Sequence, residues 1–174
     1  IRQTANLSEE NAAQFDNSLG MLDNTIGDLR KTAHNLMPEA LVKYGLYDAL
    51  KDFCHRMEAS SQIAINFSTY GERREYSNTA SVFLYRIVQE LVNNTFKHSR
   101  ASFIHLTQNK TDKHFYIRMH HDGDGLTQTD YEKLRDTPQG LGLKNIHSRV
   151  KIMNSKVIFE KDATNTYYKI TIEI

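Results

Sequence analysis

Residues 84–98 constrain the fold most strongly, because their pattern allows only one side of a helix to be buried. Apolar side chains recur every three or four positions, as in an amphipathic helix, at Leu84, Ile87, Val88, Leu91, Val92 and Phe96. Glu90, Asn94 and His98 follow one another at intervals of four and therefore line one edge of the apolar stripe. This polar edge is either a solvated surface or one wall of a binding site.

Strand-like segments around this helix give it a layer to pack on. Alternating stretches predict strands at residues 62–71, 102–108, 114–121, 156–161 and 166–174, the last two as a hairpin. Further helices are predicted at residues 39–61 and 140–153. This order favours the α+β class, as a two-layer sandwich with a mixed, mainly antiparallel sheet covered by helices on one face. Residues 126–139 lack a steady period and are predicted to form a mobile loop.

A narrow apolar seam marks the N-terminal part of the chain. Apolar residues recur at alternating intervals of three and four from Ala12 to Leu36, which is the repeat of a coiled coil or helical bundle. Pro38 ends this helix, because the residue before a proline is pushed out of helical space. The pattern favours packing between helices of a bundle over packing on the helix's own domain. We therefore predict a bundle helix at residues 1–38 and a separate domain at residues 39–174.

Composition argues against several classes of function. The 174 residues carry a net charge of +1, which gives no reason to expect nucleic acid as a partner. The lone Cys54 offers no disulfide framework and favours a reducing compartment. No apolar run approaches the roughly 20 residues that span a bilayer, and no signal peptide is visible. Because the chain starts at Ile1, we expect it to be part of a longer protein.

Three short polar motifs lie far apart along the chain. The first is Glu-x-x-x-Asn-x-x-Lys-His at residues 90–98, the second is HDGDG at residues 121–125, and the third is QGLGL at residues 139–143. Glycines at the start of a helix allow backbone N–H groups to approach an anion. Each motif alone has ordinary structural explanations. Their order along the chain, however, resembles the Bergerat ATP-binding fold, which sensor histidine kinases share with DNA gyrase B, Hsp90 and MutL.

Within this fold, the chain is most similar to histidine kinases related to nitrate and lipid-fluidity sensors. The segment LRKTAHNLMPEALVKYGLYDAL, residues 29–50, resembles the link between the second dimerisation helix and the ATP-binding domain of such kinases. The resemblance implies that residues 1–38 are the second helix of a histidine-phosphotransfer bundle. It also implies that the full-length protein is a homodimer through this helix.

The resemblance implies ATP and Mg²⁺ as cofactors. Asn94 matches the asparagine whose amide oxygen binds Mg²⁺, a cation that prefers oxygen ligands. Glu90 matches a catalytic glutamate that orients metal-bound water or assists proton movement, and Lys97 and His98 match a basic pair near the phosphates. The remaining implied contacts are Gly123 and Gly125 beneath the adenine, Gly140, Leu141, Gly142 and Leu143 at the ATP lid formed by residues 126–139, and Thr166 behind the base.

Two positions depart from the family pattern. The pattern is Asp-x-Gly-x-Gly, whose aspartate accepts a hydrogen bond from the adenine amino group, and this chain has His121 there. A neutral imidazole can accept one hydrogen bond, whereas an imidazolium cannot. The neighbouring Asp122 has the opposite strand parity and would point away unless the strand end slips. Asn165 replaces a glycine, which is a milder change because asparagine tolerates positive φ.

A phosphate-accepting histidine followed by an acidic residue is expected on the first dimerisation helix of such a kinase. In this chain only His121 precedes an acidic residue, and it lies in the glycine motif. His34 precedes Asn35 and falls on the second helix by the resemblance. The acceptor is therefore expected outside this chain. A metal site at His120, His121 and Asp122 is disfavoured, because adjacent strand residues face opposite ways.

The resemblance implies the ATP-binding catalytic region of a two-component sensor histidine kinase. It would transfer the γ-phosphoryl group of ATP to a histidine outside this chain, for relay to the receiver domain of a response regulator. This region is expected in the cytoplasm, and the parent protein is compatible with an anchor in the cell membrane. One alternative is a non-catalytic dimerisation scaffold with a degenerate nucleotide pocket, which His121 favours. A second is a serine-kinase relative acting on an anti-anti-sigma partner, which the N-terminal seam disfavours.

Overall fold

The computed structural model describes residues 15, 18–19, 38–71, 76–110, 115–161 and 167–174. The chain forms two compact units, residues 1–39 and residues 40–174. In the first unit Phe15 and Leu19 are helical and exposed, and the rest of the predicted seam lies outside the described residues. No helix in the described part of the chain is both long and apolar enough to cross a membrane.

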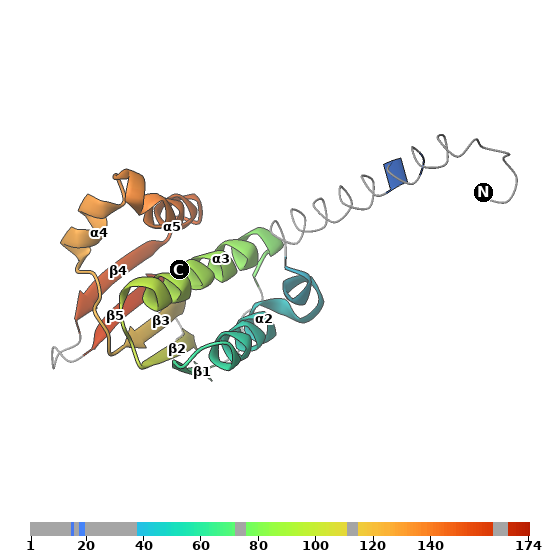
Figure 1. Ribbon diagram of the computed structural model, residues 1–174, viewed down its shortest axis with the longest axis horizontal. Helices are drawn as coiled ribbons and strands as arrows, with labels where there is room; N and C mark the ends of the chain where they lie inside the picture. The colour runs from blue at the N-terminus through green and yellow to red at the C-terminus, as the bar shows by residue number, and fades with distance from the viewer. Residues whose placement is uncertain (1–14, 16–17, 20–37, 72–75, 111–114, 162–166) are drawn as a thin grey trace, which may run out of the picture. The chain divides into compact units, whose positions relative to one another are not determined.

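The second unit is built on a five-stranded mixed sheet (Figure 1). Its strands are β1 (Ala64–Tyr70), β2 (Phe103–Lys110), β3 (Phe115–His121), β4 (Lys156–Lys161) and β5 (Tyr168–Glu173). They lie in the order β1-β2-β3-β5-β4. β1 runs parallel to β2, and all other neighbours are antiparallel. The predicted mixed, mainly antiparallel sheet is therefore confirmed.

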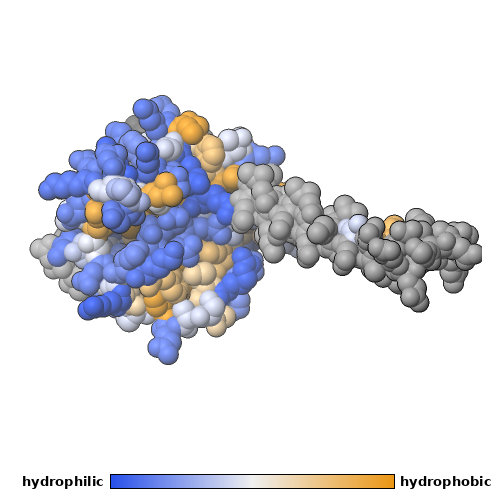
Figure 2. All heavy atoms as spheres, turned by 45° about the horizontal axis from the view of Figure 1, so that its top comes forward, coloured by the Kyte–Doolittle hydropathy of each residue, from blue (hydrophilic) through white to orange (hydrophobic). Residues whose placement is uncertain are grey.

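Long helices cover one face of this sheet (Figure 1), namely α2 (Glu39–Ala59), α3 (Asn78–His98) and α5 (Leu141–Ile152). Their apolar side chains share one core with the strand residues that face them, such as Ile104 and Ile117. In β3 every second residue from Phe115 to His121 is buried, while the residues between them are partly exposed. The predicted two-layer sandwich is confirmed. On the face of this unit drawn in Figure 2, hydrophilic residues surround smaller hydrophobic areas.

Local signals set the ends of α3. Ser77 is the N-cap, and its hydroxyl accepts a hydrogen bond of 3.3 Å from the N–H of Ala80. At the other end the N–H of Ser99 donates to the carbonyl of Thr95. The apolar stripe between these ends is buried, and Ile87, for example, is 0% exposed. Burial of this stripe fixes the rotation of the helix and therefore the direction of its polar edge.

The prediction of a mobile loop at residues 126–139 is wrong, because the segment contains helix α4 (Gln128–Leu134) and the short helix η1 (Pro138–Gly140). Thr127 and Asp130 form a reciprocal capping box at the start of α4. Tyr131 is buried, and its ring stacks on that of Phe159 with 4.4 Å between centroids. A short polar helix has little periodicity of its own, so the cap and one aromatic contact determine this structure.

Candidate functional site

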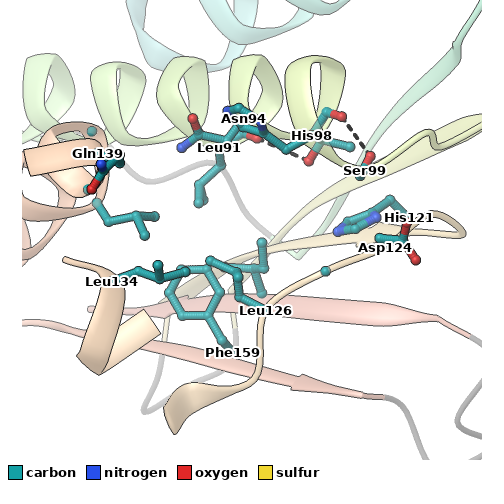
Figure 3. A pocket seen from close by; sticks show the side chains of 16 residues that line it. Leu91, Asn94, His98, Ser99, His121, Asp124, Leu126, Leu134, Gln139 and Phe159 are labelled. Atoms are coloured by element: carbon teal, nitrogen blue, oxygen red, sulfur yellow. Dashed lines mark hydrogen bonds between the residues drawn. The ribbon is translucent and has the colours of Figure 1, made fainter. Parts of the chain in front are cut away.

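A cavity of about 360 Å³ lies between α3, the turn after β3 and the segment that leads into α5 (Figure 3). Apolar side chains from all of these elements and from β4 and β5 provide much of its lining. The polar groups are fewer and come from Asn94, Thr95, His98, Ser99, His121, Asp124 and Gln139. An apolar cavity of this size with a few convergent polar groups is typical of a site for a small organic ligand.

Helix α3 provides one wall of the cavity. Leu91, Asn94, Thr95 and His98 line it, which are the positions three, four and seven residues apart that share one helix face. The hydroxyl of Thr95 donates to the carbonyl of Leu91 at 3.1 Å, so this donor is already paired within the helix. Asn94 and His98 lie one turn apart on this wall (Figure 3). This part of the polar edge is therefore the wall of a site rather than a purely solvated surface.

The turn after β3 is fixed closely beneath the end of α3. The N–H of Asp124 donates to the carbonyl of Ser99 at 2.6 Å. A Cβ at Gly123 would overlap the backbone of Ser99 and Ala101, so this close approach requires glycine. Asp122 points away from the cavity, because its carboxylate accepts hydrogen bonds from the N–H groups of Ser102 at 2.8 Å and Phe103 at 3.1 Å. The strand end has not slipped, so residue 121 is the one that faces the core.

His121 continues the buried parity of β3 and is 2% exposed. Its ring stacks on Tyr168, with 5.7 Å between centroids and planes 12° apart. Gly125 makes room for this arrangement, because a Cβ there would overlap the Tyr168 ring. Burial lowers the pKa of His121, the charge of Asp122 raises it, and His120 lowers it, with a net decrease. The imidazole is therefore neutral at neutral pH.

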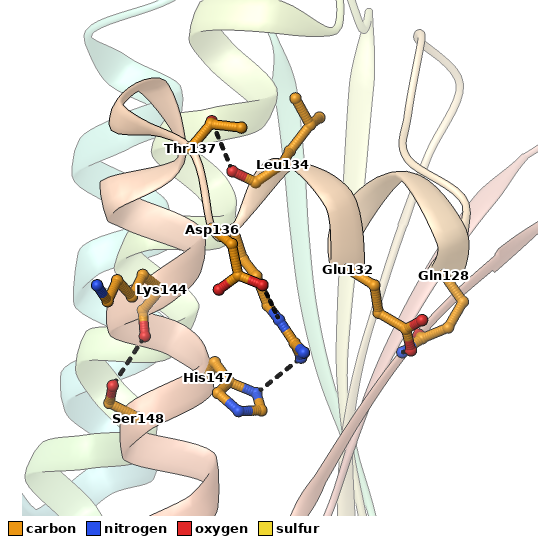
Figure 4. A network of polar contacts seen from close by, with 9 residues as sticks. Gln128, Glu132, Leu134, Asp136, Thr137, Lys144, His147 and Ser148 are labelled. Atoms are coloured by element: carbon orange, nitrogen blue, oxygen red, sulfur yellow. Dashed lines mark hydrogen bonds and ion pairs between the residues drawn. The ribbon is translucent and has the colours of Figure 1, made fainter.

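The segment between β3 and α5 closes another side of the cavity, where Leu126, Leu134, Gln139 and Gly140 line it. Helix α4 is held to the edge of the sheet, because the side-chain carbonyl of Gln128 accepts a hydrogen bond of 3.0 Å from the N–H of Phe159. Its end is tied to α5, where Arg135 lies 3.2 Å from Nδ1 of His147 (Figure 4). Arginine can only donate, so this nitrogen of His147 is the acceptor.

Gly142 near the start of α5 packs against Glu90 of α3. A Cβ at Gly142 would overlap the carboxylate of Glu90, so the two helices approach closely at this point. Glu90 and Asn94 are one turn apart on α3, which places a carboxylate and an amide along the same edge. The first glycine of the motif, Gly140, is packed equally closely, because a Cβ there would overlap the carbonyl of Leu134.

Comparison with known protein families identifies this arrangement. The model of the histidine kinase-, DNA gyrase B- and HSP90-like ATPases matches residues 79–174, which is more than half of the chain. The chain belongs to this ATPase family. The matched residues include α3, both glycine motifs and all strands except β1. Membership in the ATPase family implies that the cavity binds ATP.

Two similar proteins are named as histidine kinases. The chain is 25% identical over 138 residues to the signal transduction histidine-protein kinase/phosphatase DegS of Brevibacillus brevis, which covers 79% of this chain and 34% of that protein. It is 28% identical over 157 residues to the sensor histidine kinase ComP of Bacillus subtilis, which covers 88% of this chain and 19% of that protein. The chain therefore spans only 34% and 19% of the length of these two relatives.

A solved structure supports the fold. The blue-light activated histidine kinase of Erythrobacter litoralis EL346 superposes with a TM-score of 0.61 at 16% sequence identity, over 74% of this chain and 41% of that chain. The ATPase fold of the second unit is thus shown by both sequence and structure.

The ATPase cavity brings together most of the residues that the sequence motifs single out. Those that line it are Asn94, His98, His121, Gly125, Gly140, Gly142 and Leu143. Glu90, Lys97, Gly123 and Leu141 lie outside the lining. Lys97 and Leu141 are exposed, whereas Glu90 and Gly123 support the lining through the close contacts described above. Thr166 lies outside the described residues, and its place behind the base stays a prediction.

The ATPase cavity also contains residues that the motifs do not include. Thr95 and Ser99 continue the α3 face at intervals of four from Leu91, and this spacing could have revealed them. Asp124 lies between the two glycines of HDGDG and could have been included on position alone. Phe159 and Ile170 come from β4 and β5, and only the order of strands in the sheet brings them to the cavity.

The donor groups fit a magnesium ion held together with a nucleotide. Asn94 provides an amide oxygen on the cavity wall, and Glu90 provides a carboxylate one turn away. The described residues contain no group of three or more histidine, cysteine or acidic side chains that could hold a metal by themselves. Mg²⁺ commonly keeps several waters and binds one or two protein oxygens together with substrate phosphates. The sparse donor set is therefore compatible with Mg²⁺ that arrives with ATP.

Proposed function

We propose that this chain is the ATP-binding catalytic region of a two-component sensor histidine kinase. The observation that carries the proposal is the cavity itself, in which the Asn94 wall, the turn after β3 and the two lid glycines converge in a member of the ATPase family. Relatives named as histidine kinases, which cover most of this chain, support the kinase rather than another ATPase of the family. The reaction would transfer the γ-phosphoryl group of ATP to a histidine outside this chain.

The chain's own residues would act by positioning and by charge stabilisation. Asn94 would hold Mg²⁺ through its amide oxygen, and Glu90 would orient a metal-bound water from one turn away. His98 and Lys97 stand at the end of α3, where positive charge would favour the phosphates. The backbone N–H groups at the start of α5 lie beside Gly140 and Gly142 and would complete the phosphate site. Magnesium would supply neutralisation of the phosphate charge.

The finer assignment rests on the sequence resemblance. It places the chain among kinases like the nitrate and lipid-fluidity sensors, with residues 1–38 as the second dimerisation helix and residues 39–174 as the catalytic domain. A homodimer, a response-regulator receiver domain as phosphate acceptor and a cytoplasmic location belong to the same proposal. A membrane anchor in the parent protein is compatible with it.

A nucleotide titration tests the proposal most directly. Thermal unfolding of the chain should be measured with increasing ATP and Mg²⁺, because a ligand that binds only the folded state raises the unfolding temperature with its concentration. Adenosine without phosphates is the matched control and should shift the unfolding temperature much less. Absence of any shift with nucleoside triphosphates would favour the scaffold alternative, in which the cavity is degenerate. Phosphate transfer to histidine should then be measured with the full-length parent protein.

A further inference from the structure

We call the part of the cavity at His121 the base end, because the family pattern puts the adenine amino group at this position. It contains an unusual polar group, and the inference drawn from it rests on the proposed nucleotide-binding function. Nδ1 of His121 is buried and has no hydrogen-bond partner among the described residues. Stacking on Tyr168, which in turn packs against Gly125, fixes the plane of the ring. The imidazole extends from β3 towards the cavity, so its outer nitrogen Nε2 is the one that a ligand can reach (Figure 3).

The position of the proton follows from this asymmetry. A neutral imidazole has one N–H donor and one bare acceptor nitrogen. If Nδ1 carried the proton, a buried N–H donor would stay unpaired, which is rarer in folded proteins than an unpaired acceptor. If Nε2 carries the proton, the donor faces the cavity, where water or a ligand can accept its hydrogen bond. His121 therefore presents an N–H donor to the base, where the family's aspartate presents an acceptor.

We propose that His121 makes the base end of this cavity select 6-oxopurine nucleotides, such as GTP and ITP, over ATP. The 6-oxo group of guanine is an acceptor and fits a donor at Nε2, whereas the 6-amino group of adenine is a donor and faces another donor. ATP can bind only after the proton moves to Nδ1, which leaves the buried donor unpaired. Burial also lowers the pKa of His121, so the ring is neutral at neutral pH and the two tautomers are the relevant states.

Titration with three nucleotides tests this proposal. The affinities of the chain for GTP, ITP and ATP should be measured with Mg²⁺ by calorimetry, and we expect GTP to bind roughly tenfold or more tightly than ATP, since an unpaired buried polar group has about this effect. ITP carries the same 6-oxo acceptor and should bind about as tightly as GTP. His121→Asp should reverse the preference towards ATP. His121→Asn, whose amide can donate and accept, should bring the two affinities together and serves if the aspartate variant does not fold.

Controls separate this inference from the proposed function. His120→Asp changes the neighbouring residue on the opposite face of β3 and should leave the preference unchanged. If the chain binds ATP more tightly than GTP and neither His121 variant changes the ratio, the inference is wrong while nucleotide binding stands. If no triphosphate binds, the proposed function itself fails, and the inference fails with it.

Discussion

Glu90 on α3 and Gly142 on α5 pack so closely that a methyl group on Gly142 would overlap the Glu90 carboxylate. The first prediction follows from this contact. Gly142→Ala should leave the free energy of unfolding nearly unchanged, because alanine favours a helix by about 1 kcal/mol over glycine and only a flexible carboxylate has to move. The rate of phosphate transfer by the parent protein should nevertheless fall by roughly tenfold or more, because the displaced Glu90 no longer holds its position in the site.

Gly140→Ala is the matched control for this prediction. A Cβ at Gly140 would overlap the backbone carbonyl of Leu134, which cannot turn aside. We therefore expect this variant to lower the free energy of unfolding by about 1–3 kcal/mol, as overpacking does. Chemical denaturation of both variants distinguishes the two effects. Equal stability losses would contradict the distinction between a flexible and a rigid neighbour.

A second prediction concerns Asn94 and magnesium. Asn94→Ala should abolish the Mg²⁺ dependence of ATP binding while the fold is retained, because Asn94 lines the cavity and is not part of the buried stripe. Calorimetric titration with and without Mg²⁺ gives the measurement. The neighbouring Asn93 lies outside the cavity lining, so Asn93→Ala should keep the Mg²⁺ dependence. A variant at Asn94 that still responds to Mg²⁺ as the wild type does would place the metal elsewhere.

The third prediction concerns the pH dependence that His121 brings to stability. Its pKa is lowered in the folded state, mainly by burial, against about 6.5 in the unfolded chain. As pH falls below about 6.5, the unfolded chain takes up a proton that folded His121 does not, so the free energy of unfolding decreases down to the lowered pKa. His121→Phe keeps an aromatic ring on Tyr168 and should show a smaller loss of stability over this range.

ATP affinity should also fall in acid. ATP needs a bare nitrogen of His121 as acceptor, and an imidazolium accepts no hydrogen bond.

Other charged and titratable groups lie near the His121 ring. Asp122 raises the pKa of His121, and His120 lowers it. Lys161 lies over Tyr168, the ring on which His121 stacks, with Nζ 5.1 Å from the centre of the Tyr168 ring. The neighbours' own titrations are present in both wild type and His121→Phe, so the difference between the two pH profiles reports the titration of His121 in its native surroundings. Parallel pH profiles of the two chains would show that His121 does not titrate as expected.

A fourth prediction concerns Asp122. Its carboxylate accepts hydrogen bonds from the N–H groups of Ser102 and Phe103 and from the Ser102 hydroxyl, and so joins the end of β3 to the start of β2. Asp122→Ala should lower the free energy of unfolding by about 1 kcal/mol, since the group is close to solvent and water replaces part of the loss. The ratio of GTP to ATP affinity should not change. A changed ratio would show that Asp122 takes part in base recognition.

The fifth prediction concerns assembly through the N-terminal seam. Replacement of Leu22 and Leu29 by lysine should lower the oligomeric mass in sedimentation, because charged side chains would have to be buried at a bundle interface. Asn24→Lys, which adds a charge at a polar position outside the seam, is the control and should leave the mass unchanged. A wild-type chain that is monomeric at high concentration would contradict self-association through this seam alone.

Much of the fold could be predicted because its signals are periodic. The stripe on α3 and the alternation in β3 are both imposed by burial of one face, and both are visible in the sequence as spacings of three to four and of two. The same parity predicted that His121 faces inwards and Asp122 outwards, as the hydrogen bonds of Asp122 confirm. Periodicity thus gave the direction of the side chain at the position where, by the resemblance, the chain departs from the family pattern.

Other parts of the site could not be predicted, because they depend on contacts between distant segments. Helix α4 is stabilised by Tyr131 on Phe159, a residue of a strand that follows much later in the chain. Ile170 reaches the cavity because β5 lies between β3 and β4, and no local pattern encodes that order. The close contact between Glu90 and Gly142 is of the same kind. Motifs showed which residues to consider, and packing between layers decided which of them meet.

The hydrogen bond between Gln128 and the backbone of Phe159 has a consequence beyond the cavity. Strand β4 is at one edge of the sheet, and the N–H of Phe159 would otherwise be open to pairing with a strand of another molecule. The Gln128 side chain occupies this N–H, so α4 also shields this position of the sheet edge against pairing with another molecule. Any movement that released α4 from β4 would expose a strand edge that can pair with other molecules, so solubility would limit how freely α4 can detach.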